Sequence, residues 1–345
     1  MFVTREVHMP VVPSARGNGT PAAAALLVLA ALAVVVVSVS TAPWSGPGER
    51  AAVFPANLTL HIAGPSHPGG GELSGYAQPA DAVELGGQLF VLDTGNNRIL
   101  VQDRAGNVHR VIDGSSDERL ALRGAMAMAT DGRYLYVANS GASQVLVLEP
   151  TGAVVKTLDI PPDAATGRPA RPIGLAVGPV GDLFVSDPAG NRVLHYGSDG
   201  ALLQTLGGGA RAGGSDGFNA PGGVALDGAG YIYVVDILNG RVAKLSPDGS
   251  FVQQFGRPGD TAGTFSRPKD VAVDDAGNVY VSDGLLAVIQ VFSPAGEYLG
   301  FIGRTDPGDP RSQSLFTAPA GLSVDGDRLL VVDRFAGMFA FQLQH

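Results

Sequence analysis

One short motif recurs six times along the chain and constrains its fold more than any other feature. The motif is an apolar run that ends in Asp or Asn. Its copies are LFVLD ending at Asp93, LYVAN at Asn139, LFVSD at Asp187, IYVVD at Asp236, VYVSD at Asp283 and LLVVD at Asp333. Successive copies lie 46 to 50 residues apart. A fixed period of this length is typical of a repeat architecture, in which each repeat is one supersecondary unit.

Each repeat reads as four short strands separated by turns. In the fourth repeat the runs are GVALD, YIYVVD, RVAKLS and SFVQQF, with Gly, Asp, Asn and Pro between them. Such runs, rich in β-branched and aromatic residues, are typical of strands and hairpins. The first two runs are apolar on both faces, as in a sheet covered on both sides, and the fourth is more polar, as expected for an outer edge. Four-stranded sheets of this period, arranged radially, form a β-propeller.

The repeats resemble those of the NHL family. The likeness lies in PGGVALD followed by GYIYVVD, in DTGNNRILVQDRAG at 93–106, and in the inter-repeat segment GGSDGFNAP at 213–221. Six copies cover about residues 55–345. The resemblance implies an all-β, six-bladed NHL-type β-propeller, of the membrane-anchored bacterial type.

The sixth copy stops after its third strand, which would leave an open sheet edge. The segment ANLTLHIAG, Ala56–Gly64, has the form of the fourth strands in the other copies. We therefore expect a strand over residues 57–63 to complete the last blade and to join the two ends of the propeller.

An apolar segment near the N-terminus predicts membrane attachment. Residues 22–39 contain no charge, and as a helix they would span about 27 Å, close to the hydrocarbon thickness of a bilayer. Arg5 and Arg16 precede this segment, which favours a cytoplasmic N-terminus. We expect a cytoplasmic segment at 1–21, a single-pass signal anchor at 22–39, a linker at 40–54 and an extracytoplasmic propeller at 55–345. The alternative is a signal peptide that is cleaved, followed by secretion.

Composition and charge exclude several classes of site. The chain has no Cys, so disulfides and thiolate metal sites are excluded. Its six His residues are scattered over the repeats, which does not predict a zinc site. Its formal net charge is −9, which repels phosphate backbones, and we expect no nucleic-acid partner.

The polar residues that recur from repeat to repeat are expected to stabilise turns rather than to form a functional site. The Asp that ends each second strand is expected to accept backbone N–H groups of the turn that follows it. Arg98, Arg192 and Arg241 recur five residues after three of these Asp residues. We expect them to pair with neighbouring turns.

Polar departures from the repeat give a first candidate site. Asp81 and Asp270 stand where the third, fourth and sixth copies have Gly174, Gly223 and Gly321, and Glu84 replaces an apolar residue of the first strand. Because this strand is innermost, Asp81, Glu84 and Asp270 are candidates for a polar or cation site at the mouth of a central channel. Ca²⁺ is the ion considered there, and no cofactor is otherwise expected. The alternative is that these residues cap local loops.

Apolar departures give a second candidate site. The turn after the second strand is polar in the first three copies and apolar in the last three. The residues concerned are Ile237, Leu238, Leu285, Leu286 and Phe335. A contiguous apolar patch of this kind marks a partner site. The alternative is that these side chains pack under the longer linkers.

These features favour a binding or scaffold/sensor module without catalysis, in which a protein partner binds within the membrane or on the face of the propeller that carries the loops linking the repeats. The competing hypothesis is a metal-dependent lyase or lactonase-type propeller with a site in the channel. The resemblance to NHL-like lyases carries over no catalytic residue, because their His metal ligands have no counterparts that can be placed in this sequence.

Overall fold

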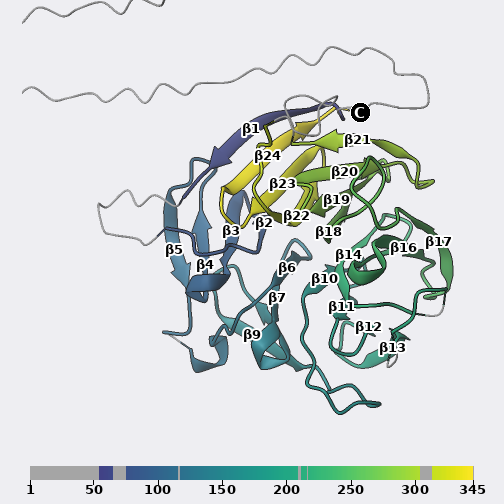
Figure 1. Cartoon of the computed structure of the whole chain (residues 1–345). Coiled ribbons are helices and arrows are strands. Elements are labelled where there is room, and N and C mark those ends of the chain that lie inside the picture. The colour runs from purple at the N-terminus through teal and green to yellow at the C-terminus, as the bar shows by residue number, and fades with distance from the viewer. Residues whose placement is uncertain are drawn as a thin grey trace, which may run out of the picture. The chain divides into compact units, whose positions relative to one another are not determined.

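The computed structural model describes residues 54–64, 75–115, 117–208, 211–215, 217–303 and 313–344. In these ranges the chain forms six antiparallel sheets of four strands each. Figure 1 shows the sheets arranged around a common centre. This confirms the prediction of an all-β six-bladed propeller, and the sheets are called blades 1 to 6 in chain order.

The strand bounds follow the sequence repeat. Blade 1 contains β2 (Asp81–Leu85), β3 (Gln88–Asp93), β4 (Arg98–Gln102) and β5 (Val108–Ile112). Blade 2 contains β6 (Ala127–Thr130), β7 (Leu135–Asn139), β8 (Gln144–Leu148) and β9 (Val154–Asp159). Blade 3 contains β10 (Gly174–Val177), β11 (Leu183–Asp187), β12 (Arg192–Tyr196) and β13 (Leu202–Gly207). Blade 4 contains β14 (Pro221–Leu226), β15 (Ile232–Asp236), β16 (Arg241–Leu245) and β17 (Phe251–Phe255).

The last two blades complete the ring. Blade 5 contains β18 (Pro268–Val273), β19 (Val279–Asp283), β20 (Val288–Phe292) and β21 (Tyr298–Ile302). Blade 6 contains β22 (Pro319–Asp325), β23 (Arg328–Asp333), β24 (Gly337–Leu343) and, from the other end of the chain, β1 (Ala56–Ile62). Four single 3₁₀ turns are described, at Thr94–Asn96, Glu118–Leu120, Ser140–Ala142 and Ile237–Asn239.

Burial explains why each sequence run forms its strand. The second strands β3, β11, β15, β19 and β23 are buried almost throughout, because both of their faces pack against neighbouring blades. The outer strands β9 and β17 alternate mostly between half-buried and exposed residues, because one side meets solvent. The apolar side chains form clusters between adjacent blades, so each blade depends on its neighbours for a complete core.

The strand β1 occupies the outer position of blade 6. It pairs with β24 in antiparallel register, from Ala56 opposite Leu343 to Ile62 opposite Met338. Phe54, just before β1, is buried and packs in the core between blades 5 and 6. Its N–H donates to the carbonyl of Phe301 at the outer strand of blade 5. The two ends of the described chain are therefore tied into the same sheet.

The Asp at the end of each second strand holds the preceding linker as well as the following turn. Asp333 accepts the N–H groups of Thr317 and Ala318 in its linker and those of Phe335 and Ala336 in its turn. All five of these Asp residues are completely buried. Asn139 serves the same position in blade 2, where it accepts the N–H of Arg123 and donates its amide to the carbonyl of Ala121.

Arginine supports this position in three blades. Arg98, Arg192 and Arg241 donate to Asp93, Asp187 and Asp236 at 2.7 to 2.9 Å. Blades 5 and 6 have Val288 and Met338 there, and each of their Asp residues instead accepts four backbone N–H groups. A buried carboxylate is therefore satisfied by either set of donors.

The predicted cytoplasmic segment, signal anchor and most of the linker, residues 1–53, lie outside the described ranges. Within those ranges, no helix has the length and apolar character needed to span a bilayer.

Candidate functional site

Strand direction gives the propeller two distinct faces. The linkers between blades and the turns after the second strands share one face, here called the linker face. Hydrogen bonds join them, for example from Gly284 N–H to the Arg267 carbonyl and from Arg334 N–H to the Ala318 carbonyl. The turns after the first and third strands lie on the opposite face, here called the turn face. A central channel connects the two faces.

Glycine allows adjacent inner strands to approach closely at their linker-face end. A Cβ on Gly321 would lie 2.5 Å from the carbonyl oxygen of Ala80 and 2.6 Å from Oδ1 of Asp81. A Cβ on Gly223 would overlap Asp270 in the same way. The inner strands of adjacent blades thus approach one another too closely for side chains at these positions, and this end of the inner strands is called the neck below.

Asp81 and Asp270 connect adjacent blades at this neck. Asp81 Oδ2 accepts the N–H of Met128 in blade 2 at 2.7 Å, and Oδ1 accepts the N–H of Ala82 at 2.8 Å. Asp270 Oδ2 accepts the N–H of Leu322 in blade 6 at 2.8 Å, and Oδ1 accepts the N–H of Val271 at 2.9 Å. Each carboxylate therefore caps an amide of the inner strand in the next blade, as well as the amide that follows it.

Burial shifts the protonation of both groups. It raises the pKa of Asp270 to about 7 against the backbone hydrogen bonds from Leu322 and Val271, which lower it. Burial also raises the pKa of Asp81 well above its usual value, and the charge of Asp270 raises it further. The two carboxyl groups, from blades 1 and 5 on either side of blade 6, thus interact electrostatically at the neck.

Glu84 lies elsewhere in the channel. Its Oε1 accepts from Arg104 at 2.6 Å, and its Oε2 accepts from Arg328 of blade 6 at 2.8 Å. Its side chain is nearly buried between these two cations. The structure therefore brings Asp81 and Asp270 to the same end of the inner strands, whereas Glu84 joins blade 1 to blade 6 nearer the turn face.

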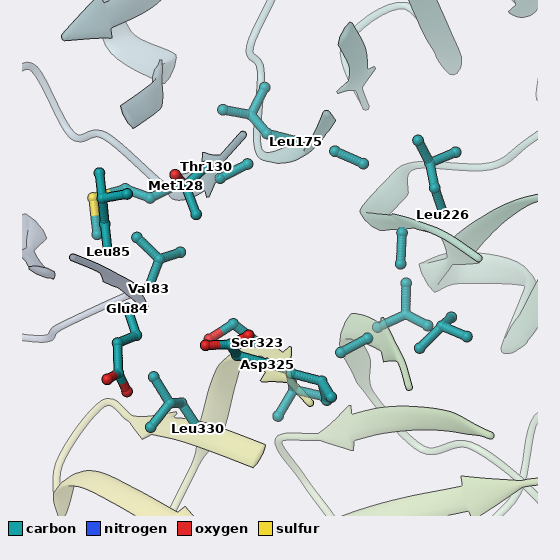
Figure 2. Close-up of a pocket in the computed structure, with 18 of the residues that line it drawn as sticks. Val83, Glu84, Leu85, Met128, Thr130, Leu175, Leu226, Ser323, Asp325 and Leu330 are labelled. Carbon is teal, nitrogen blue, oxygen red and sulfur yellow. The ribbon is translucent and has the colours of Figure 1, made fainter. Parts of the chain in front are cut away.

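A cavity of about 510 Å³ lies in the channel between the neck and the turn face. All six inner strands contribute to its wall. Figure 2 shows Val83, Leu85, Met128, Leu175 and Leu226 around the space, with Thr130, Ser323 and Asp325 as polar neighbours. The hydroxyls of Thr130 and Ser323 donate to the carbonyls of Tyr134 and Ala82. The cavity is thus lined by aliphatic side chains and by polar groups that are largely engaged.

No group of three or more His, Cys, Asp or Glu side chains that could hold a metal ion is found in the described part of the chain. Asp81 and Asp270 supply two carboxylates, and each already accepts two backbone N–H groups. The histidines with described partners are used locally: His195 pairs with Asp182 at 2.7 Å and stacks on Phe184, and His61 stacks on Phe339.

The apolar departures from the repeat divide into exposed and half-buried side chains. Leu238, Leu285 and Phe335 are 59%, 66% and 68% exposed. Each stands two residues after the buried Asp of its blade, so they occupy equivalent positions on the linker face of blades 4, 5 and 6. Ile237 and Leu286 are half-buried, and Ile237 packs against the core between blades 4 and 5. The exposed three, Leu238, Leu285 and Phe335, are called the apolar patch below.

Cations that the repeat analysis did not single out flank this patch. Arg267 and Lys269 stand on either side of Pro268 at the start of β18, and Arg334 follows Asp333 at the end of β23. Burial lowers the pKa of Lys269, and the positive charges of Arg267 and Arg334 lower it further. The sequence carried a partial signal: basic residues stand on both sides of Pro268 in blade 5, and one follows Asp333 in blade 6.

Comparisons with solved structures find many propellers. A protein of unknown function from Bacteroides thetaiotaomicron is 14% identical with a TM-score of 0.64, over 84% of this chain and 76% of that one. A gluconolactonase from Xanthomonas campestris is 15% identical with a TM-score of 0.60, over 84% and 90%. A streptogramin B lyase is 14% identical with a TM-score of 0.57, over 79% and 96%. At these identities the likeness supports the six-bladed fold alone.

No protein-family model matches the chain, and no curated protein matches its sequence. The NHL resemblance therefore stays an interpretation of the repeat motifs.

Proposed function

We propose that the chain is a membrane-anchored, extracytoplasmic NHL-type propeller that binds a protein partner on its linker face and performs no catalysis. The single observation that carries the proposal is the apolar patch. Three large apolar side chains are more than half exposed at equivalent positions of three consecutive blades. The equivalent positions of blades 1, 2 and 3 hold Gly95, Gly141 and Ala189, so the patch is confined to one side of the face.

Exposure of this kind is costly in a protein that acts alone. Burying one Leu or Phe side chain contributes about 1.5–3 kcal/mol, and none of the three patch residues gains that within the propeller. Their backbone is meanwhile held firmly: Asp283 and Asp333, two residues before Leu285 and Phe335, each accept four N–H groups. Rigidly presented apolar side chains suit recognition, because little conformational entropy is lost on binding.

The position at which the chain enters the propeller supports binding at this face. β1 begins at Ala56, opposite Leu343, which is the turn-face end of blade 6. The segment that carries the predicted anchor therefore joins the propeller on the face opposite to the patch. A partner contacting the linker face does not compete with this connection.

The test is affinity capture from intact membranes with the full chain. The double variant Leu285→Asp with Phe335→Asp should retain the melting temperature of the wild type and lose its captured partner. Val180→Asp is the matched control, because Val180 is 78% exposed in a turn-face loop. Loss of the same partner from the control, or retention by the double variant, would refute the linker face as the binding surface.

A second candidate, an enzyme with its site in the channel, is favoured by one observation. Asp81 and Asp270 have raised pKa values, and such groups are enriched at catalytic sites. Metal analysis of the purified ectodomain, combined with lyase and lactonase assays, separates this candidate from the first. A stoichiometric metal that is lost in Asp270→Asn would favour the enzyme.

A further inference from the structure

We propose that the partner segment bound at the apolar patch is acidic, and that Arg267, Lys269 and Arg334 recognise its carboxylates. The proposal rests on the proposed function and adds the chemistry of the partner: a peptide segment in which Asp or Glu residues alternate with apolar side chains. Arg267, Lys269 and Arg334 are called the basic group below.

The basic group adjoins the apolar patch through the backbone. Gly284, the residue before Leu285, donates its N–H to the carbonyl of Arg267. Gly284 also lies close to Lys269: a Cβ built on Gly284 would be 3.6 Å from Lys269 Cγ. Arg334 immediately precedes Phe335. A segment that covers Leu285 and Phe335 therefore passes over all three cations.

The three charges lie close enough to affect one another. After burial, the charges of Arg267 and Arg334 are the causes that lower the pKa of Lys269, so the cations repel each other in the free protein. An anion placed among them relieves this repulsion and gains attraction from each. Electrostatic complementarity of this kind gives specificity and speeds association.

No described carboxylate forms an ion pair with this group, although the charge of the buried Asp283 attracts Lys269 and opposes the repulsion from the two arginines. The side chains of Arg267 and Lys269 make no hydrogen bond or ion pair with any described residue, and Arg334 donates to the neutral amide oxygen of Gln78 at 2.8 Å. The nearest repeat carboxylates, Asp283 and Asp333, are completely buried and saturated by backbone donors.

The contrast with the other blades is informative. In blades 1, 3 and 4 an Arg neutralises the buried Asp, and the ion pair is shielded inside the blade. In blades 5 and 6 the Asp takes backbone donors instead. Of the cations in these blades, Arg267 is exposed, and Lys269 and Arg334 are half-buried beside exposed Leu285 and Phe335.

A peptide fits this surface better than a nucleic acid does. The chain as a whole carries a net charge of −9, which opposes a long polyanion. A short acidic segment needs only a local positive site, and its apolar side chains account for the patch, which phosphate backbones do not. The recognition is therefore assigned to carboxylates.

The experiment selects random displayed peptides on the purified full chain in detergent and measures the affinity of the selected peptides for four variants. These are Arg267→Glu alone, Arg267→Glu with Lys269→Glu, the double variant Leu285→Asp with Phe335→Asp, and Arg133→Glu. Arg133 is an exposed turn-face residue and serves as the charge control. Arg267→Glu changes one exposed side chain and keeps the test valid if the double charge reversal fails to fold.

The expected result is selection of peptides enriched in Asp or Glu together with Leu, Ile or Phe. Their affinity should fall about tenfold in Arg267→Glu, and more in the double reversal, and should be unchanged in Arg133→Glu. Peptides without acidic enrichment that depend on Leu285 and Phe335 would overturn this inference and leave the proposed function intact. Failure to select any peptide that depends on Leu285 and Phe335 would overturn both. Charge-dependent binding of a random single-stranded RNA pool without acidic peptides would overturn the carboxylate assignment.

Discussion

Asp270 and Leu322 are joined across the boundary between blades 5 and 6, where the carboxylate accepts the backbone N–H of Leu322 at 2.8 Å. Asp81 makes the corresponding bond from blade 1 to Met128 of blade 2. The inner strand of a blade has a free edge toward the channel, and these two side chains cap part of it. The same residues are partly deprived of water, so their structural role and their raised pKa values have one origin.

This arrangement predicts a pH-dependent stability. An unfolded Asp loses its proton near pH 4, whereas Asp270 loses it near its folded pKa of about 7. The folded state therefore binds more protons than the unfolded state between these values, and its stability falls as the pH rises through this window. In Asp270→Asn, which keeps an oxygen for Leu322, we expect the free energy of unfolding relative to wild type to rise by about 2–4 kcal/mol from pH 4 to pH 8.

Chemical denaturation across this pH range measures the effect. Asp248→Asn is the control, because Asp248 lies in an exposed turn and hydrogen bonds lower its pKa. The relative stability of the control should therefore fall or stay level as the pH rises. A difference between wild type and Asp270→Asn that does not change with pH would show that Asp270 is already ionised when folded at low pH.

The neck predicts intolerance of any side chain at Gly321. A Cβ there would press on the carbonyl of Ala80 and the carboxylate of Asp81, so Gly321→Ala should destabilise the propeller by about 2–4 kcal/mol. Gly75→Ala is the matched control, since its Cβ would meet open space. Thermal unfolding of both variants checks the prediction, and equal melting temperatures would contradict the close approach of the inner strands.

The end of the second strand in blade 2 is predicted to favour Asn over Asp, whereas the other blades favour Asp over Asn. Asn139 both accepts the N–H of Arg123 and donates to the carbonyl of Ala121. In Asn139→Asp a second carboxylate oxygen would face that carbonyl, and we expect a loss of about 1–3 kcal/mol. Asp333→Asn should also destabilise the propeller. Asp333 uses both oxygens to accept N–H groups, so the amide NH₂ of an Asn would replace one of these acceptors with a donor. Destabilisation in only one of the two variants would show that the amide and the carboxylate are not matched to their donors.

Closure by β1 predicts that the first described strand is needed for cooperative unfolding. A chain beginning at residue 65 lacks Phe54 and Ile62, both buried, and leaves β24 as an open edge. We expect it to unfold without a sharp transition, whereas a chain beginning at residue 50 should melt like the full-length chain. Indistinguishable calorimetric transitions for the two truncations would contradict the closure.

The fold was predictable because its signal is repeated. Six copies of an apolar run, at a nearly constant spacing, define the blades even though the second copy ends in Asn139 rather than Asp. The candidate site was less accessible. Glu84 breaks the inner-strand pattern in the same way as Asp81, yet its partner Arg328 lies 244 residues away. Only the closed ring brings blade 6 beside blade 1, so no local pattern distinguishes an ion-paired Glu84 from a free one.

The positions of the surface residues were also predictable only in part. The apolar turns of blades 4 to 6 stand out against the polar turns of blades 1 to 3, but periodicity does not reveal which residue of each turn points outward. Leu285 is exposed and Leu286 is half-buried, although the N–H groups of both are tied to Asp283. The basic group combines residues of two blades, and its members become neighbours only through the pairing of linker and turn.

The central claim is that the linker face of blades 4 to 6 contacts a partner protein. The most direct measurement places a photo-crosslinking amino acid at position 285, 335 or 180 of the full chain in intact cells. We predict covalent adducts with one partner from positions 285 and 335, and none with that partner from position 180 on the turn face. Adducts from position 180 alone, or none from 285 and 335, would contradict the claim.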